Sequence, residues 1–361
     1  MRINAPEIIE QPDTVKIQAA IEHDSGTEYL WYEMERKYAR YLTGKLDGFL
    51  VGVLPGAMAR AENIELGGPV SETLLYNVTN SYMRLLGGAN PDLKCVKINA
   101  RLLDDGRSSP LADAVGTGFS GGIDSFCVLV DHFRQCPYPG YKVTHCVFNN
   151  VGSHGSGPSE ANRRLFRARL ALAKTCLDEL GLPLLWIDSN LTEFLKMGFQ
   201  KTHVPRNLSA ILLLQGLFGK YLYASAYQHK DCHFRETYDL AFTDPAAVHL
   251  LSTETLRSIS TGCQYSRVEK TAKVSDWAAA QRYLNVCVNA DAQGRNCSVC
   301  EKCCRTLLTL ELLGKLELFH GVFDIDKYRT VRSAFLSVCL HSQEDPFWRE
   351  IADLWREKSG A

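Results

Sequence analysis

The feature that most constrains the fold of this chain is the stretch GFSGGIDS at residues 118–125. It lies between a short run of small and apolar residues at 112–115 and a longer apolar run, FCVLV, at 126–130. Two adjacent glycines allow backbone N–H groups to converge on one point, because no Cβ atom interferes. The order of these segments predicts a strand, a glycine turn and then a helix whose first turn faces an anion.

Polar side chains add chemistry to this turn. Ser120 and Ser125 supply hydroxyl donors beside the glycines, so the loop is suited to hold a pyrophosphate. Asp124 is placed to hold Mg²⁺ or to orient a phosphate-bound water. The loop is not a Walker loop, because no Gly-Lys-Ser or Gly-Lys-Thr triplet occurs in the chain. The simpler alternative is a serine-glycine turn before a buried helix.

The segments after the loop alternate between strand and helix. Residues 142–149 and 184–188 have the composition of strands, and 161–180 has the spacing of an amphipathic helix. This order predicts a doubly wound parallel sheet, in which ligands gather at the carboxyl ends of the strands. The polar turn at 149–158 is therefore expected beside the phosphate loop. Its His154 is predicted either to contact phosphate or substrate, or to be a solvated loop residue.

Two further segments carry candidate ligands. The segment HVPRN at 203–207 precedes a predicted apolar helix at 208–218. Its Arg206 and Asn207 can meet a carboxylate, a phosphate or an adenine edge. Lys270, at the start of another helical stretch, is either a phosphate ligand or part of a solvated helix face.

Four cysteines have the spacing of a metal site. Cys297, Cys300 and Cys303 form two consecutive Cys-x-x-Cys steps, and Cys287 lies ten positions earlier. Four thiolates close a tetrahedral zinc site, so a structural zinc knuckle is predicted. An iron–sulfur cluster and four unrelated reduced cysteines are the alternatives. With 13 cysteines and no signal-peptide core, the chain is expected to hold reduced thiols in the cytoplasm.

Three regions are expected along the chain. Residues 1–110 are predicted to form a small α+β domain able to cover the nucleotide site, 111–310 the α/β domain with the zinc site, and 311–361 a helical extension. A formal net charge of −1 gives no reason to expect nucleic acid as a partner. No apolar run approaches the length of a membrane span, so no membrane partner is expected.

The SGGIDS loop resembles that of the PP-loop ATP pyrophosphatases, which have an adenine nucleotide alpha hydrolase-like, HUP-like fold. Together with VPRN at 204–207 and C-x9-C-x2-C-x2-C at 287–303, it resembles the 7-cyano-7-deazaguanine synthases over roughly residues 113–310. The resemblance implies a ligase that uses ATP and Mg²⁺, contains Zn²⁺, and adenylates a carboxylate or carbonyl oxygen of a deazapurine or similar substrate. Pyrophosphate leaves, and nitrogen insertion gives an amide and then a nitrile. By this resemblance, pyrophosphate and Mg²⁺ contact Ser120, Gly121, Gly122, Asp124 and Ser125.

Arg206 and Asn207 lie, by the same resemblance, near the nucleotide or the acid, and the four cysteines bind zinc. The family's VPGRN has lost its glycine here, and NVGSH at 150–154 replaces its tyrosine-glycine-glutamine turn. About 110 residues precede the shared region. These departures predict a divergent relative that acts on a small-molecule acid or purine. The expected second substrate is a nitrogen or sulfur donor, and a homodimer is one possible oligomeric state.

The sequence is compatible with several alternatives. One is sulfur insertion, as in 6-thioguanine biosynthesis, through a persulfide on Cys127 or Cys263. Another is a phage-defence relative that modifies a protein partner, and a third is a nucleotide-binding subunit without catalysis. Transfer RNA thiolation is disfavoured, because the chain has no excess of basic residues.

Overall fold

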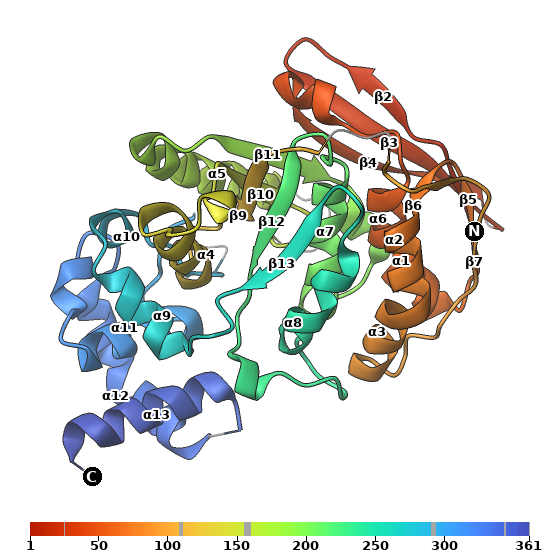
Figure 1. The fold of residues 1–361 in the computed structure, drawn as a ribbon. Coiled ribbons are helices and arrows are strands. Elements are labelled where there is room, and N and C mark those ends of the chain that lie inside the picture. Colours follow the sequence, from red (N-terminus) through yellow and green to blue (C-terminus); the bar gives the residue numbers. More distant parts are fainter. Residues whose placement is uncertain (25, 108–110, 155–159, 290–293, 343, 361) are drawn as a thin grey trace.

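The computed structural model describes residues 1–361 except 25, 108–110, 155–159, 290–293, 343 and 361. It shows a mixed α/β protein built around one large, mostly parallel sheet (Figure 1). In the described residues the sheet has 11 strands in the order β13-β12-β9-β10-β11-β4-β3-β1-β5-β7, with β2 paired to β3.

The strands that follow residue 110 form the parallel part of the sheet. They are β9 (Ala114–Gly118), β10 (His145–Asn150), β11 (Leu184–Ser189), β12 (Phe218–Ala224) and β13 (Arg257–Thr261). All neighbouring pairs among them are parallel, as predicted. The chain adds β10 and β11 on one side of β9 and then β12 and β13 on the other. The direction of winding therefore reverses between β9 and β12, where ligands bind in doubly wound sheets.

The strands of residues 1–110 extend the same sheet beyond β11. They are β1 (Arg2–Asn4), β2 (Glu7–Glu10), β3 (Thr14–His23), β4 (Gly26–Glu35), β5 (Ile64–Gly67) and β7 (Ile98–Ala100). Strand β4 runs antiparallel to β11, with Met34 opposite Ile187. Strands β6 (Val70–Ser71) and β8 (Leu103–Asp104) form a separate pair. The N-terminal region thus shares its main sheet with the rest of the protein.

Helices cover both faces of the sheet (Figure 1). They are α1 (Asp47–Arg60), α2 (Glu72–Asn77), α3 (Met83–Ala89), α4 (Ile123–Leu129), α5 (Glu160–Leu180), α6 (Leu191–Leu195), α7 (His203–Leu212), α8 (Asp244–Ala247), α9 (Arg267–Ser275), α10 (Ala278–Tyr283), α11 (Glu301–Leu312), α12 (Ile325–His341) and α13 (Pro346–Ser359). Successive strand residues enter opposite cores. Val147 of β10 packs in the core that holds α1 and α7 residues, whereas Cys146 and Phe148 pack in the core of α4, α5 and α11.

The predicted helix at 208–218 was wrong at both ends. Helix α7 begins at His203 and ends at Leu212, and Phe218 already belongs to β12. Pro205 is compatible with the earlier start, because the first N–H groups of a helix have no partner within the helix. The segment HVPRN, which was predicted to precede the helix, therefore forms its beginning. The helical C-terminal region, α12 and α13, is confirmed.

Candidate functional site

A cavity of about 600 Å³ opens at the carboxyl ends of β9, β10 and β12. This volume is typical of a site for a small molecule. The charged residues among its described lining are Arg169, Arg267, Lys302, Arg305 and Asp124. Four cationic side chains thus surround one carboxylate at the point where the winding of the sheet reverses, so the cavity is suited to a polyanion.

The glycine turn forms one wall of this cavity. Gly121 has a φ of +77°, a conformation that side chains disfavour, and its carbonyl accepts the backbone N–H of Asn285 at 2.8 Å. The Ser125 hydroxyl donates to the Gly122 carbonyl at 2.9 Å, so it stabilises the first turn of α4. The exposed Ser120 Oγ lies 3.4 Å from the Gly122 nitrogen. The predicted loop therefore faces the cavity, with Ser120 as its accessible hydroxyl.

Asp124 is held between two cations. Its Oδ2 lies 2.9 Å from Arg267 Nη2, and its Oδ1 lies 3.0 Å from Lys270 Nζ. Burial opposes ionisation of this carboxyl, but the two cations overcome that effect and hold its pKa below the usual range. Lys270 is fully buried, does not line the cavity, and also donates to the carbonyls of Ser225 and Ala226 at 2.5 and 2.9 Å. Lys270 therefore contacts Asp124, which lines the cavity, but does not line the cavity itself.

Arg267, Lys302 and Arg305 form a cationic wall on α9 and α11. The guanidinium groups of Arg267 and Arg305 lie 4.7 and 4.3 Å from the centre of the Phe347 ring. Burial and the neighbouring positive charges lower the pKa of both Lys302 and Arg305. The fold therefore holds like charges together against their mutual repulsion, which a bound polyanion would relieve.

The two candidate ligands of the VPRN segment differ in their position relative to the cavity. Asn207 lines the cavity, but Arg206 does not, and its side chain is buried at 1% exposure. Arg206 donates to the carbonyls of Val151 and Met197 at 2.9 and 2.8 Å, and to the Thr202 hydroxyl at 2.7 Å. The expectation of a ligand-binding Arg206 is thus corrected. Adjacent residues of an α-helix point about 100° apart, so the early start of α7 turns Arg206 away from the site.

His154 lines the cavity as a buried aromatic residue. Its ring lies 5.3 Å from both the Phe148 and the Phe166 ring centroids. Burial, aided by the positive charge of Arg169, lowers the pKa of His154 to about 3. The imidazole is therefore neutral at physiological pH and can offer an anion only a hydrogen bond. Residues 155–158 of the predicted glycine-rich turn lie outside the described part of the chain.

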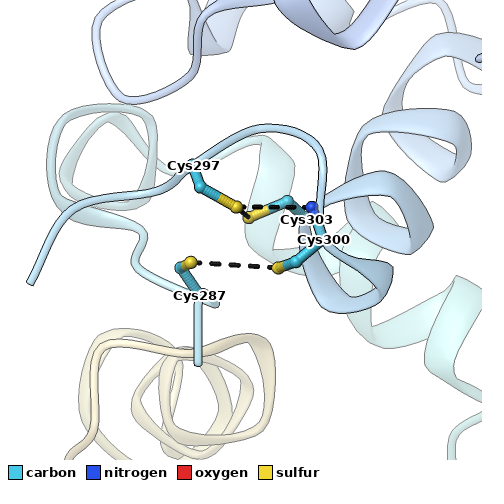
Figure 2. Close-up of side chains that lie close together, drawn as sticks. All are labelled: Cys287, Cys297, Cys300 and Cys303. Atoms are coloured by element: carbon cyan, nitrogen blue, oxygen red, sulfur yellow. Dashed lines mark hydrogen bonds between the residues drawn. The ribbon is translucent and has the colours of Figure 1, made fainter. Parts of the chain in front are cut away.

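The four predicted cysteines come together in one cluster (Figure 2). Cys300 precedes α11, Cys303 lies in its first turn, and Cys287 approaches from the segment after α10. All four Sγ atoms lie within 4.8 Å of one another, with Cys287 to Cys300 at 3.8 Å and Cys297 to Cys303 at 4.0 Å. A tetrahedral zinc site with Zn–S bonds of about 2.3 Å has sulfur separations of about 3.8 Å. The cluster can therefore hold a metal ion such as zinc.

The structure also revises what surrounds the cavity. No described residue of the N-terminal 110 lines it, because that region joins the sheet beyond β11. Neither Cys127 nor Cys263 is among the described lining residues. Sequence reasoning missed Arg267 and Lys302, although each had a local signal. Arg267 lies three residues before Lys270, and Lys302 lies between two cysteines of the knuckle.

No protein-family model, no curated protein and no solved structure matches the chain. In the described residues, no helix is both long enough and apolar enough to span a membrane.

Proposed function

We propose that this protein is an ATP-dependent enzyme that transfers AMP to a carboxylate or carbonyl oxygen of a nucleobase-like acid and releases pyrophosphate. A nitrogen nucleophile then displaces AMP to give an amide, and a second round gives a nitrile. The observation that carries the proposal is the cavity itself, where a glycine turn, one carboxylate and four cations meet at the reversal of the sheet. Such a site binds a polyphosphate and stabilises the negative charge that develops on a departing one.

The residues present fit a nucleotide with its divalent cation. Ser120 and the backbone of Gly122 would hold phosphate oxygens at the turn that Gly121 makes, and the cationic wall would neutralise the pyrophosphate. Mg²⁺ binds nucleotides through phosphate oxygens and one or two carboxylates, and it would supply charge neutralisation on the phosphates. Asp124 is the carboxylate available for it in the described lining. No nucleophilic side chain is needed, because AMP is a good leaving group.

Nitrogen insertion is favoured over sulfur insertion by where the thiols lie. A persulfide route needs a thiolate at the nucleotide, but Cys127 and Cys263 are 1% and 2% exposed and do not line the cavity. Burial raises the pKa of Cys127 to about 12, so this thiol carries no charge at neutral pH. The hydrogen bond with Cys232 lowers the pKa of Cys263, so it is the burial of Cys263 outside the cavity, and not its protonation, that argues against this thiol. The proposed role of the cysteine cluster is a structural zinc site that supports the cavity wall.

Mass spectrometry of the products tests the proposed function. The full chain would be incubated with ATP, Mg²⁺, ammonia and 7-carboxy-7-deazaguanine, the acid substrate of the resembled family. AMP, pyrophosphate and an amide or nitrile are expected. Formation of ADP, or no turnover with any nucleobase acid, would contradict adenylation.

A pair of matched variants links the activity to the cavity. Asp124→Ala removes the carboxylate between Arg267 and Lys270 and is expected to abolish AMP formation. Asp131→Ala is the control. Asp131 lies in the helical segment that directly follows α4, pairs with Lys273 at 2.8 Å and does not line the cavity. Equal loss in both variants would indicate damage to the helix rather than loss of a phosphate-site residue.

A further inference from the structure

A chain of three hydrogen-bonding side chains leads away from the cavity wall. The Tyr223 hydroxyl lies 2.8 Å from His203 Nδ1, and His203 Nε2 lies 3.1 Å from Asp239 Oδ1. Asp239 Oδ1 also accepts the backbone N–H of Ala241 at 2.9 Å, which fixes the carboxylate. A neutral imidazole with its proton on Nε2 satisfies both contacts, since it donates to Asp239 and accepts the Tyr223 proton at Nδ1.

Tyr223 is the member of this chain that faces the cavity. It lines the cavity near the end of β12, whereas His203 and Asp239 do not line it. Its neighbour Leu222 pairs with Thr117 of β9, so Tyr223 lies beside the strand end from which the phosphate loop departs. A group bound between the loop and β12 would therefore be within reach of the phenol oxygen.

The charges around His203 favour this imidazole as a proton acceptor. Burial opposes charge on the imidazole, but the hydrogen bond and the negative charge of Asp239 outweigh burial and the opposing charge of Lys302, so they raise the pKa of His203 above its ordinary value. Burial raises the pKa of Asp244 to about 8, so this carboxyl is mostly protonated at neutral pH. Asp239 is the ionised partner, because His203 holds its pKa low despite burial.

We propose that Tyr223, His203 and Asp239 form a proton relay that deprotonates the nitrogen nucleophile when it displaces AMP. The relay deepens the adenylation proposed above and rests on it. A C–N bond forms at the activated carbon, and AMP leaves with the electron pair of the C–O bond. The proton of the nitrogen passes to the Tyr223 oxygen while the hydroxyl proton moves to His203 Nδ1. The imidazolium that results faces the Asp239 carboxylate, as in other relays that pair histidine with an acid.

The neighbouring amides indicate which acid would be bound there. Asn149 and Asn207 line the same cavity, and Asn149 Nδ2 lies 3.4 Å from Asn207 Oδ1. The other polar atom of Asn149, Oδ1, is buried and has no hydrogen-bond partner among the described residues. It is therefore an acceptor for a substrate N–H. The acid would be a flat heterocycle with an N–H near its carboxyl group.

Measuring the two half-reactions separately tests the relay. ATP–pyrophosphate exchange reports adenylation, and amide formation from ammonia reports displacement of AMP. Tyr223→Phe and Asp239→Asn are expected to leave exchange within about twofold and to slow amide formation about 100-fold or more, the usual contribution of general-base catalysis. Tyr32→Phe is the matched control, because its buried hydroxyl makes one bond, to Ser209 at 2.9 Å, away from the cavity.

The pH profile gives a readout that a structural role would not produce. At a fixed concentration of unprotonated ammonia, amide formation should rise with pH as His203 loses its proton. In Asp239→Asn this rise should move to lower pH, because the group that raises the His203 pKa is gone. An amide rate in Tyr223→Phe equal to that of the native chain, or equal loss of both half-reactions, would overturn the relay alone. If the native chain makes no AMP, the proposed function fails and the relay fails with it.

Discussion

Lys302 offers the sharpest test of the cationic wall. Its ammonium group has no hydrogen bond or ion pair among the described residues, and the like charges of Arg267 and Arg305 lower its pKa together with burial. Removing a charged hydrogen-bond partner of a bound ligand costs about 1.5–3 kcal/mol. Lys302→Met should therefore weaken pyrophosphate binding about 10- to 150-fold, measured by isothermal titration calorimetry.

The same substitution should not destabilise the free protein. Methionine keeps most of the lysine stem and removes a charge that repels Arg267 and Arg305, so the melting temperature should stay the same or rise. Lys327→Met, on an exposed position of α12, removes the same charge from the surface and is the control. A dissociation constant for Lys302→Met within twofold of the native value would refute the assignment of the cationic wall to phosphate.

Two further predictions follow from the cysteine cluster and from Arg206. The purified chain should contain about one equivalent of metal, and Cys300→Ser or a chelator should lower both stability and pyrophosphate affinity, because α11 carries two of the cations. A metal-free protein of equal stability and affinity would contradict this. Arg206→Met should cost about 2–5 kcal/mol in the free energy of unfolding by denaturant, because one buried and one partly buried carbonyl lose their donor, and should leave the pyrophosphate affinity unchanged. Full stability with lost affinity would instead place Arg206 at the ligand.

The sequence predicted the parts of the site that have local signals. The glycine turn lies within eight residues, and its conformation depends on Gly121 and its neighbours, so its place between a strand and a helix was correct. The cysteine cluster could equally be predicted from the sequence, because the geometry of one metal ion restricts the spacing of its ligands.

Contacts between distant segments could not be predicted in this way. Tyr223, His203 and Asp239 are separated by 20 and 36 positions, and only the crossing of α7 beside β12 brings them together. The pairing of β4 with β11 likewise depends on a strand edge that exists only once the sheet has formed. Arg206 was misplaced because a helix start shifted by five residues changes the direction of every side chain in the segment.

The arrangement of the cavity explains why its two halves have different chemistry. The three residues of the cationic wall come from α9 and α11, and Arg169 comes from α5, whereas Asn149, Asn207 and Tyr223 come from β10, α7 and β12. The glycine turn after β9 lies between these groups, because β9 is the central strand at which the winding reverses. An ATP with its pyrophosphate on the cationic side would present its α-phosphate at the turn and face the acid on the polar side. The departing pyrophosphate and the nitrogen nucleophile would then contact separate sets of side chains. Variants of the cationic set should therefore affect adenylation, and variants of the polar set should affect displacement of AMP.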